Sequence, residues 1–309
     1  MKLLVTGGAG FIGSHVVERL LALGHAALVV DNFATARRDT LDAFRGRVEV
    51  IDATIAEPAT VDGLFARFRP DVVLHCAASY KDPDDWAEDS RTNVLGTVNV
   101  VKASVATAVR RLIYFQTALC YGSHPREQPV TLDHPLAPEN SYAISKTAGE
   151  RYVLTSGLDA LSLRLANMYG PRNLSGPVPT FYSRLAEGKP CFAVDTRRDF
   201  VFVDDLVEVV VPAVEGHGRP GIYHVSTGTD YSIRELYDAV AAAVGVDRPV
   251  EERARGADDA PTILLDPSRT AAEFGWKATT ALRDGIARTV AWYRRNGVGQ
   301  TYTHLRLPG

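Results

Sequence analysis

Cysteine is scarce in this sequence and widely scattered. Cys76, Cys120 and Cys191 are the only three in 309 residues, and no two of them form a CxxC pair. An odd, scattered set of this kind argues against a disulfide framework and against a metal site of the zinc type. We therefore expect three reduced thiols, no metal and a cytoplasmic location, since disulfides persist in oxidising compartments.

Long apolar runs and a strong net charge are also missing. No stretch reaches the roughly 18 apolar residues of a membrane span. Only the short run Leu3 to Val5 follows Met1-Lys2, whereas a signal peptide needs a longer run and a cleavage site. The net charge of −3 excludes a broad basic surface for nucleic acid. An anionic ligand must therefore be held by a local cluster of cations or backbone N–H groups.

Short apolar runs alternate with helical patterns through the first half of the chain. Strands are expected at residues 3–5, 27–30, 48–51, 71–76, 112–115 and 161–165. Helices are expected at residues 14–23 and 86–106 and from Ser141 onward, and Leu64, Phe65 and Phe68 suit the buried face of a further helix. Continuous apolar strands between helices are typical of a parallel sheet covered on both faces. The sequence therefore predicts an α/β fold with a Rossmann doubly wound parallel sheet.

The texture of the sequence changes after about Asn167. Proline and glycine become frequent, and shorter elements follow. We interpret residues 1–166 as the Rossmann domain, with a return segment at about 200–225. Residues 167–309 then form a smaller α/β substrate-binding domain. A ligand crevice is expected between the two parts.

Glycines follow the first expected strand at a spacing that suits a phosphate. Residues 6–13 read TGGAGFIG, a GxxGxxG spacing through Gly7, Gly10 and Gly13. Glycines let the backbone turn tightly and approach a pyrophosphate, and a helix N-terminus adds N–H groups and a positive dipole end. A glycine-rich turn without a ligand is the alternative. The strand, the helix and Asp31, eighteen residues past Gly13, all agree with a dinucleotide site.

An acidic residue, Asp31, closes the second expected strand. A carboxylate there accepts hydrogen bonds from ribose hydroxyls and repels a 2′-phosphate, which favours NAD over NADP. Asn32 follows it rather than an arginine. Arg37 and Arg38 lie close enough to leave NADP open.

Tyr142 and Lys146 lie four residues apart on the helix expected after Ser141, so they share one helix face. A free phenol has a pKa of about 10, and a nearby ammonium lowers such a pKa by about one to three units. The phenolate could then take a proton from a sugar hydroxyl while hydride leaves the same carbon. Tyr-x-x-x-Lys is a weak pattern by itself, and two unrelated residues on an exposed helix are the alternative.

Thr117 strengthens the catalytic interpretation of this pair. It lies just past the fifth expected strand, at the carboxyl end where ligands bind in such sheets. Its hydroxyl could bond the same sugar oxygen as Tyr142, and local capping of the backbone is the alternative.

The ordered motifs resemble an extended short-chain dehydrogenase/reductase of the NAD-dependent nucleotide-sugar epimerase/dehydratase family over nearly the whole chain. The resemblance is carried by residues 6–13, Asp31-Asn32, residues 75–78, Asn93, residues 117–122, residues 142–146, residues 164–167, residues 169–172 and residues 198–205. Residues 80–86 and 115–121 are similar to epimerases encoded in bacterial O-antigen clusters.

The resemblance implies roles for individual residues. Tyr142 would be the base, Lys146 would hold the nicotinamide ribose, and Thr117 would hold the reacting hydroxyl. The cofactor NAD would be bound by Gly7, Gly10, Phe11, Ile12, Gly13, Asp31, Asn32, Thr54, Ile55, Ala77, Ala78, Tyr142 and Lys146. Asn167 and Arg198 would bind the diphosphate of the nucleotide-sugar substrate. For Arg198, a surface ion pair is the alternative.

Further implied features concern support and the substrate. Asn93 would support the active-site helix. The sugar pocket would be bordered by Tyr80, Lys81, Arg172 and residues 174–180. The family often carries a second phosphate-binding arginine in an Arg-Pro-Gly-Asp segment, but residues 254–259 read ARGADD here, so Arg255 is not assigned a role.

The residues after Thr117 bear on which reaction the resemblance implies. Dehydratases of this family carry an acid there, often Asp-Glu, because elimination needs a group to move protons. Ala118 and Leu119 cannot do so. We therefore expect C4 epimerisation of a UDP-hexose or UDP-hexuronate through a transient 4-keto sugar. Dehydration, reduction, or C3/C5 epimerisation with Cys120 as acid/base are alternatives, and a dinucleotide-binding protein without turnover is an alternative of another class.

The resemblance also implies a homodimer, built by pairing the helices at residues 86–106 and 141–156. Val94, Val98 and Val101 on the first of these helices could lie in that interface or in the core.

Overall fold

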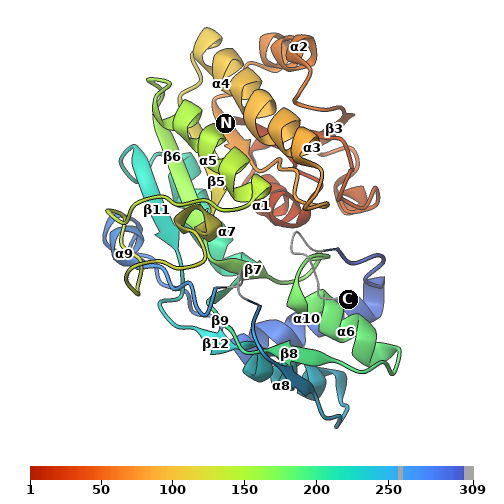
Figure 1. Ribbon diagram of the computed structural model, residues 1–309. Helices are drawn as coiled ribbons and strands as arrows, with labels where there is room; N and C mark the ends of the chain where they lie inside the picture. The colour runs from red at the N-terminus through yellow and green to blue at the C-terminus, as the bar shows by residue number, and fades with distance from the viewer. Residues whose placement is uncertain (257–259, 303–309) are drawn as a thin grey trace.

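A computed structural model of the chain describes residues 1–256 and 260–302. A seven-stranded parallel sheet lies at its centre, in the strand order β11-β6-β5-β4-β1-β2-β3 (Figure 1). The strands are β1 (Lys2–Thr6), β2 (Ala26–Asp31), β3 (Glu49–Asp52), β4 (Val72–His75), β5 (Arg111–Thr117), β6 (Ala160–Leu165) and β11 (Gly221–Val225). This sheet confirms the doubly wound α/β fold that the apolar runs predict.

The order of the strands reverses at β1. From β1 the chain builds β2 and β3 on one side and β4, β5 and β6 on the other, and Thr6 at the end of β1 is in register with His75 at the end of β4. In doubly wound sheets ligands bind outside the carboxyl ends of the strands at such a switch point. The glycine loop follows β1 directly, so it lies at this point.

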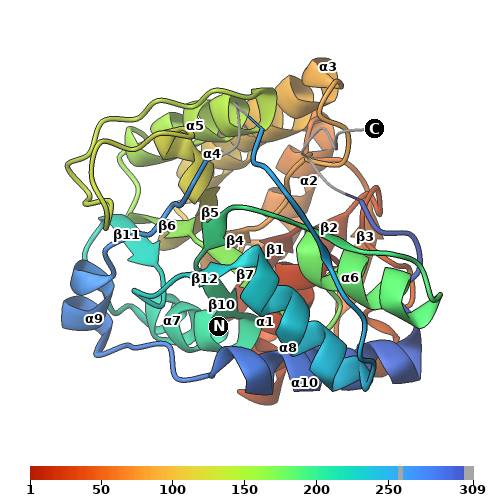
Figure 2. The ribbon, with the colours of Figure 1, turned by 60° about the horizontal axis from the view of Figure 1, so that its bottom comes forward.

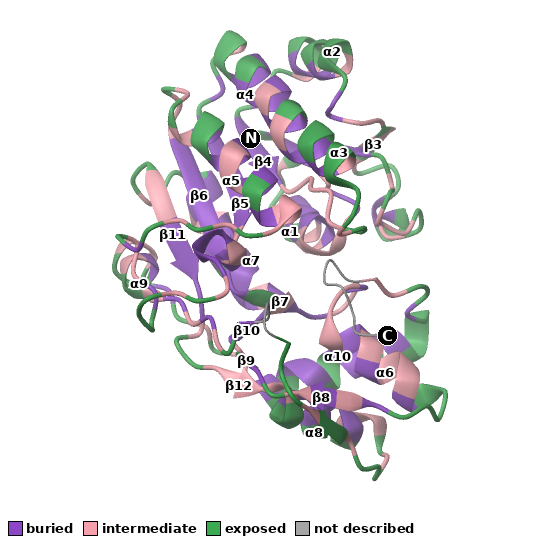
Figure 3. Cartoon of the chain, viewed as in Figure 1, coloured by how far each residue is buried: buried purple, intermediate pink, exposed green. Residues whose placement is uncertain are grey.

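Helices cover both faces of the sheet, as Figure 2 shows. Helices α1 (Phe11–Ala22) and α7 (Val203–Glu215) pack on one face, and α2 (Pro58–Phe68), α4 (Thr97–Ala106) and α5 (Ser141–Leu154) cover the other. Within β1, Leu3 and Val5 join the core under α1, while Leu4 joins the opposite core. Because the strand is apolar on both sides, it reads as a continuous hydrophobic run. The inner strands are accordingly drawn as buried in Figure 3, whereas the edge strand β3 is exposed or half-buried.

The long helix expected at residues 86–106 is divided into three parts. A short helix α3 (Trp86–Asp89) continues into a π-helical segment, Ser90–Gly96, before α4 begins. A Cβ atom at Gly96 would lie 2.7 Å from Cγ1 of Ile55, so the segment approaches the neighbouring loop closely. π-helical turns are rare and occur often at functional sites.

The remaining elements surround a second core, except α9 (Ser268–Phe274), which packs against β11 of the large sheet. They are β7 (Asn167–Tyr169), α6 (Pro177–Ala186), β8 (Phe192–Val194), β9 (Arg197–Arg198), β10 (Phe200–Phe202), β12 (Tyr231–Ser232), α8 (Ile233–Val244), β13 (Glu251–Arg253), α9 and α10 (Leu282–Asn296). The short strands pair as β7–β10, β8–β13 and β9–β12, and α6, α8 and α10 enclose the core. Between β10 and β12 the chain returns to the large sheet through α7 and β11. Over the described residues, no helix has the length and apolar character to cross a bilayer.

A buried ion pair joins α5 to β6. Nη2 of Arg164 lies 2.7 Å from Oε2 of Glu150, and the two side chains are 3% and 0% exposed. Ser162 donates a further hydrogen bond to Glu150. Arg164 also donates to the hydroxyl of Tyr121, which belongs to the 3₁₀ turn Ala118–Tyr121 after β5. The pair therefore ties the helix that carries Tyr142 to the turn that follows Thr117.

Glu150→Ala leaves the buried Arg164 charge without its partner, so we expect a loss of about 3–5 kcal/mol in the free energy of unfolding. Urea unfolding followed by circular dichroism measures it. Asp238→Ala, which breaks the exposed pair with Arg234 on α8, is the control and should change the midpoint little. Equal midpoints for the two variants would contradict the role given to the buried pair.

Candidate active site

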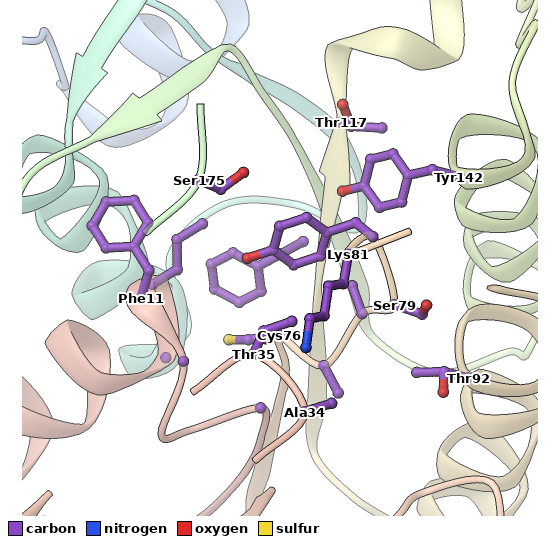
Figure 4. A pocket seen from close by; sticks show the side chains of 18 of the residues that line it. Phe11, Ala34, Thr35, Cys76, Ser79, Lys81, Thr92, Thr117, Tyr142 and Ser175 are labelled. Atoms are coloured by element: carbon purple, nitrogen blue, oxygen red, sulfur yellow. The ribbon is translucent and has the colours of Figure 1, made fainter. Parts of the chain in front are cut away.

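A cavity of about 700 Å³ opens at the carboxyl ends of the central strands, next to the second core (Figure 4). Its lining includes Gly7, Gly10, Phe11, Ile12, Gly13, Asp31, Asn32, Thr54, Ile55, Ala77, Ala78, Thr117, Tyr142, Lys146 and Asn167. The fold therefore places the expected site residues at one cavity, with the exception of Arg198.

The glycine loop leaves no room for side chains. Gly7 has a φ of +66°, and a Cβ atom there would lie 2.6 Å from the backbone nitrogen of Ala77. A Cβ atom at Gly13 would lie 2.2 Å from the carbonyl oxygen of Gly7. The N-cap residue Gly10 provides no side-chain cap for α1, and the first turn of that helix carries no acid. Its N–H groups are therefore available to an anion, and the loop fits the pyrophosphate of a dinucleotide.

Asp31 ends β2 beside the glycine loop and fastens it. Its carboxylate accepts hydrogen bonds from the backbone N–H groups of Ala9, at 2.9 Å, and Phe33, at 2.8 Å. Burial raises its pKa, while these backbone bonds act in the opposite direction. A carboxylate has about four lone-pair positions, so two bonds leave it able to accept from ribose hydroxyls as well.

The two arginines after Asp31 are engaged with other groups. Arg37 pairs with Asp39 and donates to the carbonyl oxygen of Asn296. Arg38 pairs with Asp52 and lies over the ring of Phe33. Neither arginine lines the cavity, which favours NAD over NADP.

Thr117 and Tyr142 lie next to each other at one side of the cavity, as Figure 4 shows. Thr117 is the last residue of β5, and Tyr142 lies in the first turn of α5, where the side chain of Asn140 caps the helix by accepting from the N–H of Ala143. The hydroxyl of Thr117 accepts from the N–H of Leu119 at 3.2 Å, so it does cap the local backbone. A hydroxyl that accepts still has a hydrogen to donate, and the capping and catalytic interpretations are compatible.

Lys146 is 2% exposed, and its ammonium nitrogen lies 4.0 Å from the centre of the Tyr114 ring. Burial lowers its pKa to about 7, although Cys76 and Glu150 act to raise it. For Tyr142 the expectation of a lowered pKa is wrong. Burial, with a smaller contribution from Asp89, raises the pKa of the phenol above its ordinary value. The low-dielectric surroundings disfavour the phenolate, and Lys146 directs its charge at another ring.

Asn93, at the centre of the π-helical segment, holds the active-site elements together. Its side-chain amide donates to the carbonyl oxygen of Ser79, at 2.9 Å, and to the hydroxyl of Ser145, at 3.0 Å. Its side-chain oxygen accepts from the N–H of Ser79 at 2.8 Å. Ser145 in turn donates to the carbonyl oxygen of Tyr142. The segment thus anchors both α5 and the loop after β4, in agreement with the support role that the resemblance implies.

Two arginines lie outside the cavity lining. Arg198, on β9, donates to the carbonyl oxygens of Arg197 and Ala260, so its role on a diphosphate stays a prediction. Arg172 pairs with Glu18 of α1 and does not line this cavity, so its expected place at the sugar pocket likewise stays a prediction. Arg255 is exposed. Residues 257–259, which follow it closely, lie outside the described part of the chain.

Cysteine chemistry is not favoured by the structure. Cys120 is fully buried in a small apolar cluster and does not line the cavity, and burial raises its pKa to about 12. Cys76 does line the cavity, but burial raises the pKa of its thiol as well. Within the described residues, no group of three or more His, Cys, Asp or Glu side chains is placed to hold a metal ion.

Sequence reasoning missed Tyr302. Its hydroxyl lies 3.0 Å from that of Tyr80, which lines the cavity. Its backbone bonds to Leu174 and Gly176 on the loop between β7 and α6. A contact between residues 222 positions apart has no local sequence pattern, so only the folded chain shows it.

Comparisons with known proteins agree with this geometry. The family model described as the NAD dependent epimerase/dehydratase family matches residues 3–226. A UDP-glucose 4-epimerase of Mycolicibacterium smegmatis is 35% identical over 95% of this chain and 99% of its own length. The structure of the Bordetella bronchiseptica enzyme WbmH with NAD⁺ is 51% identical, covers 96% of this chain and 99% of that one, and has a TM-score of 0.92. That of WbmG with NAD and UDP is 47% identical, covers 98% and 97%, and has a TM-score of 0.90.

Lys146→Met should stabilise the NAD-free protein at pH 7. The lysine has an ordinary pKa of 10.5 and a folded pKa of about 7, so between these pH values the folded protein binds fewer protons than the unfolded chain. Wild-type stability therefore rises as the pH increases through this window. The methionine variant should lack that rise and gain roughly 2–4 kcal/mol at pH 7.

Denaturant unfolding between pH 6.5 and 10 measures this effect, with Lys102→Met on the exposed side of α4 as the control. If the stabilities of the wild type and of the Lys146→Met variant change with pH in the same way, Lys146 is not buried as described.

Proposed function

The chain belongs to the NAD-dependent epimerase/dehydratase family, and from that premise we propose that it inverts C4 of a nucleotide-activated sugar, with NAD as its cofactor. The observation that carries this proposal is the placement of Thr117, Tyr142 and Lys146 at one cavity beside the glycine loop. UDP is the carrier that we propose, because the related WbmG has been crystallised with UDP and the Mycolicibacterium relative is a UDP-glucose 4-epimerase.

Each residue of this set has a defined task in the proposed reaction. Bound NAD supplies a reversible hydride acceptor. As a phenolate, the Oη atom of Tyr142 would take the proton of the C4 hydroxyl while the hydrogen on C4 leaves as hydride, so that C4 becomes a ketone. It would return the proton once hydride has been added back to the other face of the sugar. The hydroxyl of Thr117 would hold the oxygen on C4 of the sugar by a hydrogen bond. Lys146, which lines the same cavity, would bind the ribose hydroxyls.

The surroundings of Thr117 favour epimerisation over dehydration. An elimination requires an acid or base that moves protons at the neighbouring carbons. Ala118 and Leu119 carry no such group, and Cys120 lies outside the cavity lining. A keto sugar that turns over and takes the hydride back needs no further acid. The positions directly after Thr117 therefore carry no group for the proton transfers of dehydration, and C4 inversion needs none there.

The two cores suggest how the ligands are divided. We assign NAD to residues 1–166, together with the return segment at about 200–225, and the nucleotide-sugar to residues 167–309. Asn167 at the start of β7 lines the cavity between them, and we propose that it binds the diphosphate. A cytoplasmic location belongs to the same proposal.

Tyr142→Phe should lower kcat for C4 inversion by roughly 10²–10⁴-fold, which is what proton transfer by a positioned group contributes. NAD affinity should stay within a few fold of the wild type, since the phenol is one contact among many. Proton NMR of UDP-glucose, UDP-galactose and UDP-glucuronate incubated with enzyme and NAD measures the inversion. If the wild-type enzyme leaves each of these sugars unchanged, or the variant works at the wild-type rate, the proposed function is wrong.

We also propose a homodimer built on α4 and α5. The large apolar side chains of Leu95, Val105, Ile144 and Tyr152 are between 46% and 52% exposed, and Trp86 is 65% exposed. They belong to α3, the π-helical segment, α4 and α5, which form one layer in Figure 1. Exposed apolar patches of this kind mark interaction surfaces. Val101 belongs to the core, whereas Val94 and Val98 are partly exposed.

Ile144→Asp combined with Tyr152→Asp should convert the dimer to a monomer, because two charges would be placed in the apolar contact. Light scattering after size-exclusion chromatography gives the mass. Leu23→Asp, at another exposed apolar residue at the end of α1, is the matched control and should remain dimeric. A wild-type protein with the mass of a single chain would exclude this dimer.

A further inference from the structure

Gln116 is a cavity residue to which the mechanism gives no task. It precedes Thr117 at the carboxyl end of β5, is 2% exposed and lines the cavity. Its side-chain oxygen accepts from the backbone N–H of Thr117 at 2.8 Å. This bond fixes which end of the amide faces Thr117, because an NH₂ group cannot accept from an N–H.

The other end of the same amide has no partner. Four buried side-chain atoms of the described residues lack a hydrogen bond, namely Asp89 Oδ1, Gln116 Nε2, Thr147 Oγ1 and Asp159 Oδ1. Of the four residues, only Gln116 lines the cavity. A buried donor without an acceptor destabilises the fold, so such a group in a binding cavity calls for a ligand that completes it.

We propose that Gln116 Nε2 donates to an oxygen of the bound sugar next to the one that Thr117 holds, and that Gln116 is a specificity-determining residue. The position of the side chain favours the sugar over the cofactor as the acceptor. Gln116 is adjacent in sequence to Thr117, whereas the glycine loop that fits the pyrophosphate follows a different strand, β1. The proposal rests on the proposed epimerase function.

The two ends of the amide then act together. The oxygen end positions the backbone of Thr117, and the nitrogen end recognises an oxygen of the sugar at a fixed distance from that residue. A site built to donate to a ligand oxygen discriminates strongly against a ligand without it, because the buried donor is then left unpaired. The sugars accepted should therefore carry a hydroxyl or carbonyl oxygen at this position.

Two substitutions separate the roles of the two ends. Gln116→Met is close in shape and removes both hydrogen bonds. Gln116→Glu keeps an oxygen for the N–H of Thr117 and, when ionised, has no hydrogen to donate. Thr147→Val removes another unpartnered buried atom, on α5 and away from the cavity lining, and is the matched control.

Kinetics with UDP-glucose and UDP-galactose test the proposal. We expect kcat/KM to fall at least tenfold in Gln116→Met and to stay unchanged in Thr147→Val. The kcat/KM of Gln116→Glu is compared with that of the wild type at each pH from 6 to 9. It should be lower at every pH if the carboxyl is ionised throughout, or should fall further as the pH rises and the carboxyl ionises. Wild-type activity of Gln116→Met, or of Gln116→Glu at every pH, would overturn the proposal.

Binding measurements identify the ligand that supplies the oxygen. NAD affinity, followed by quenching of tryptophan fluorescence, should be unchanged in Gln116→Met, while the rise in melting temperature caused by UDP-glucose should shrink. A tenfold loss of NAD affinity without the sugar would place the acceptor on the cofactor and overturn the proposal. Failure of the proposed function is distinct, because it shows as a wild-type enzyme without turnover.

Discussion

The buried pair between Arg164 and Glu150 is the interaction on which the candidate active site depends. Tyr142 and Lys146 are carried by α5, and Thr117 ends β5, so their mutual placement requires a fixed contact between these elements. Arg164 reaches both, through Glu150 on α5 and through Tyr121 in the turn after β5. Such a pair contributes little net stability compared with apolar residues of the same shape, but removing one partner costs much. Here the pair fixes geometry more than it adds stability.

Burial shifts the pKa values of Tyr142 and Lys146 in opposite directions, and both shifts favour an uncharged side chain. It raises the pKa of Tyr142 and lowers that of Lys146 to about 7, so it favours the neutral form of each. Proton transfer at the phenol therefore needs positive charge from what binds in the cavity. The same desolvation strengthens every electrostatic contact that forms there.

The sequence predicts the sheet and the cofactor loop because both depend on local patterns. Apolar runs mark the strands. The GxxGxxG spacing marks the cofactor loop, because positions 7 and 13 approach the neighbouring backbone so closely that only glycine fits. The π-helical segment at Ser90–Gly96 is not predictable this way, since its apolar pattern resembles that of an α-helix. The position of Arg198 and the pKa of Tyr142 depend on contacts between distant residues. Which faces of α4 and α5 are buried and which are exposed likewise follows only from the packed structure.

The contact between Tyr80 and Tyr302 bears on how ligands enter the cavity. Tyr302 joins Tyr80 to the loop before α6, and both the tyrosine at position 80 and that loop line the cavity. Opening this side therefore requires several hydrogen bonds to break at once. Tyr80 and residues 174–180 are also the residues expected at the sugar pocket. The contact therefore bears on how the sugar enters and leaves in every turnover, rather than on how the dinucleotide is held.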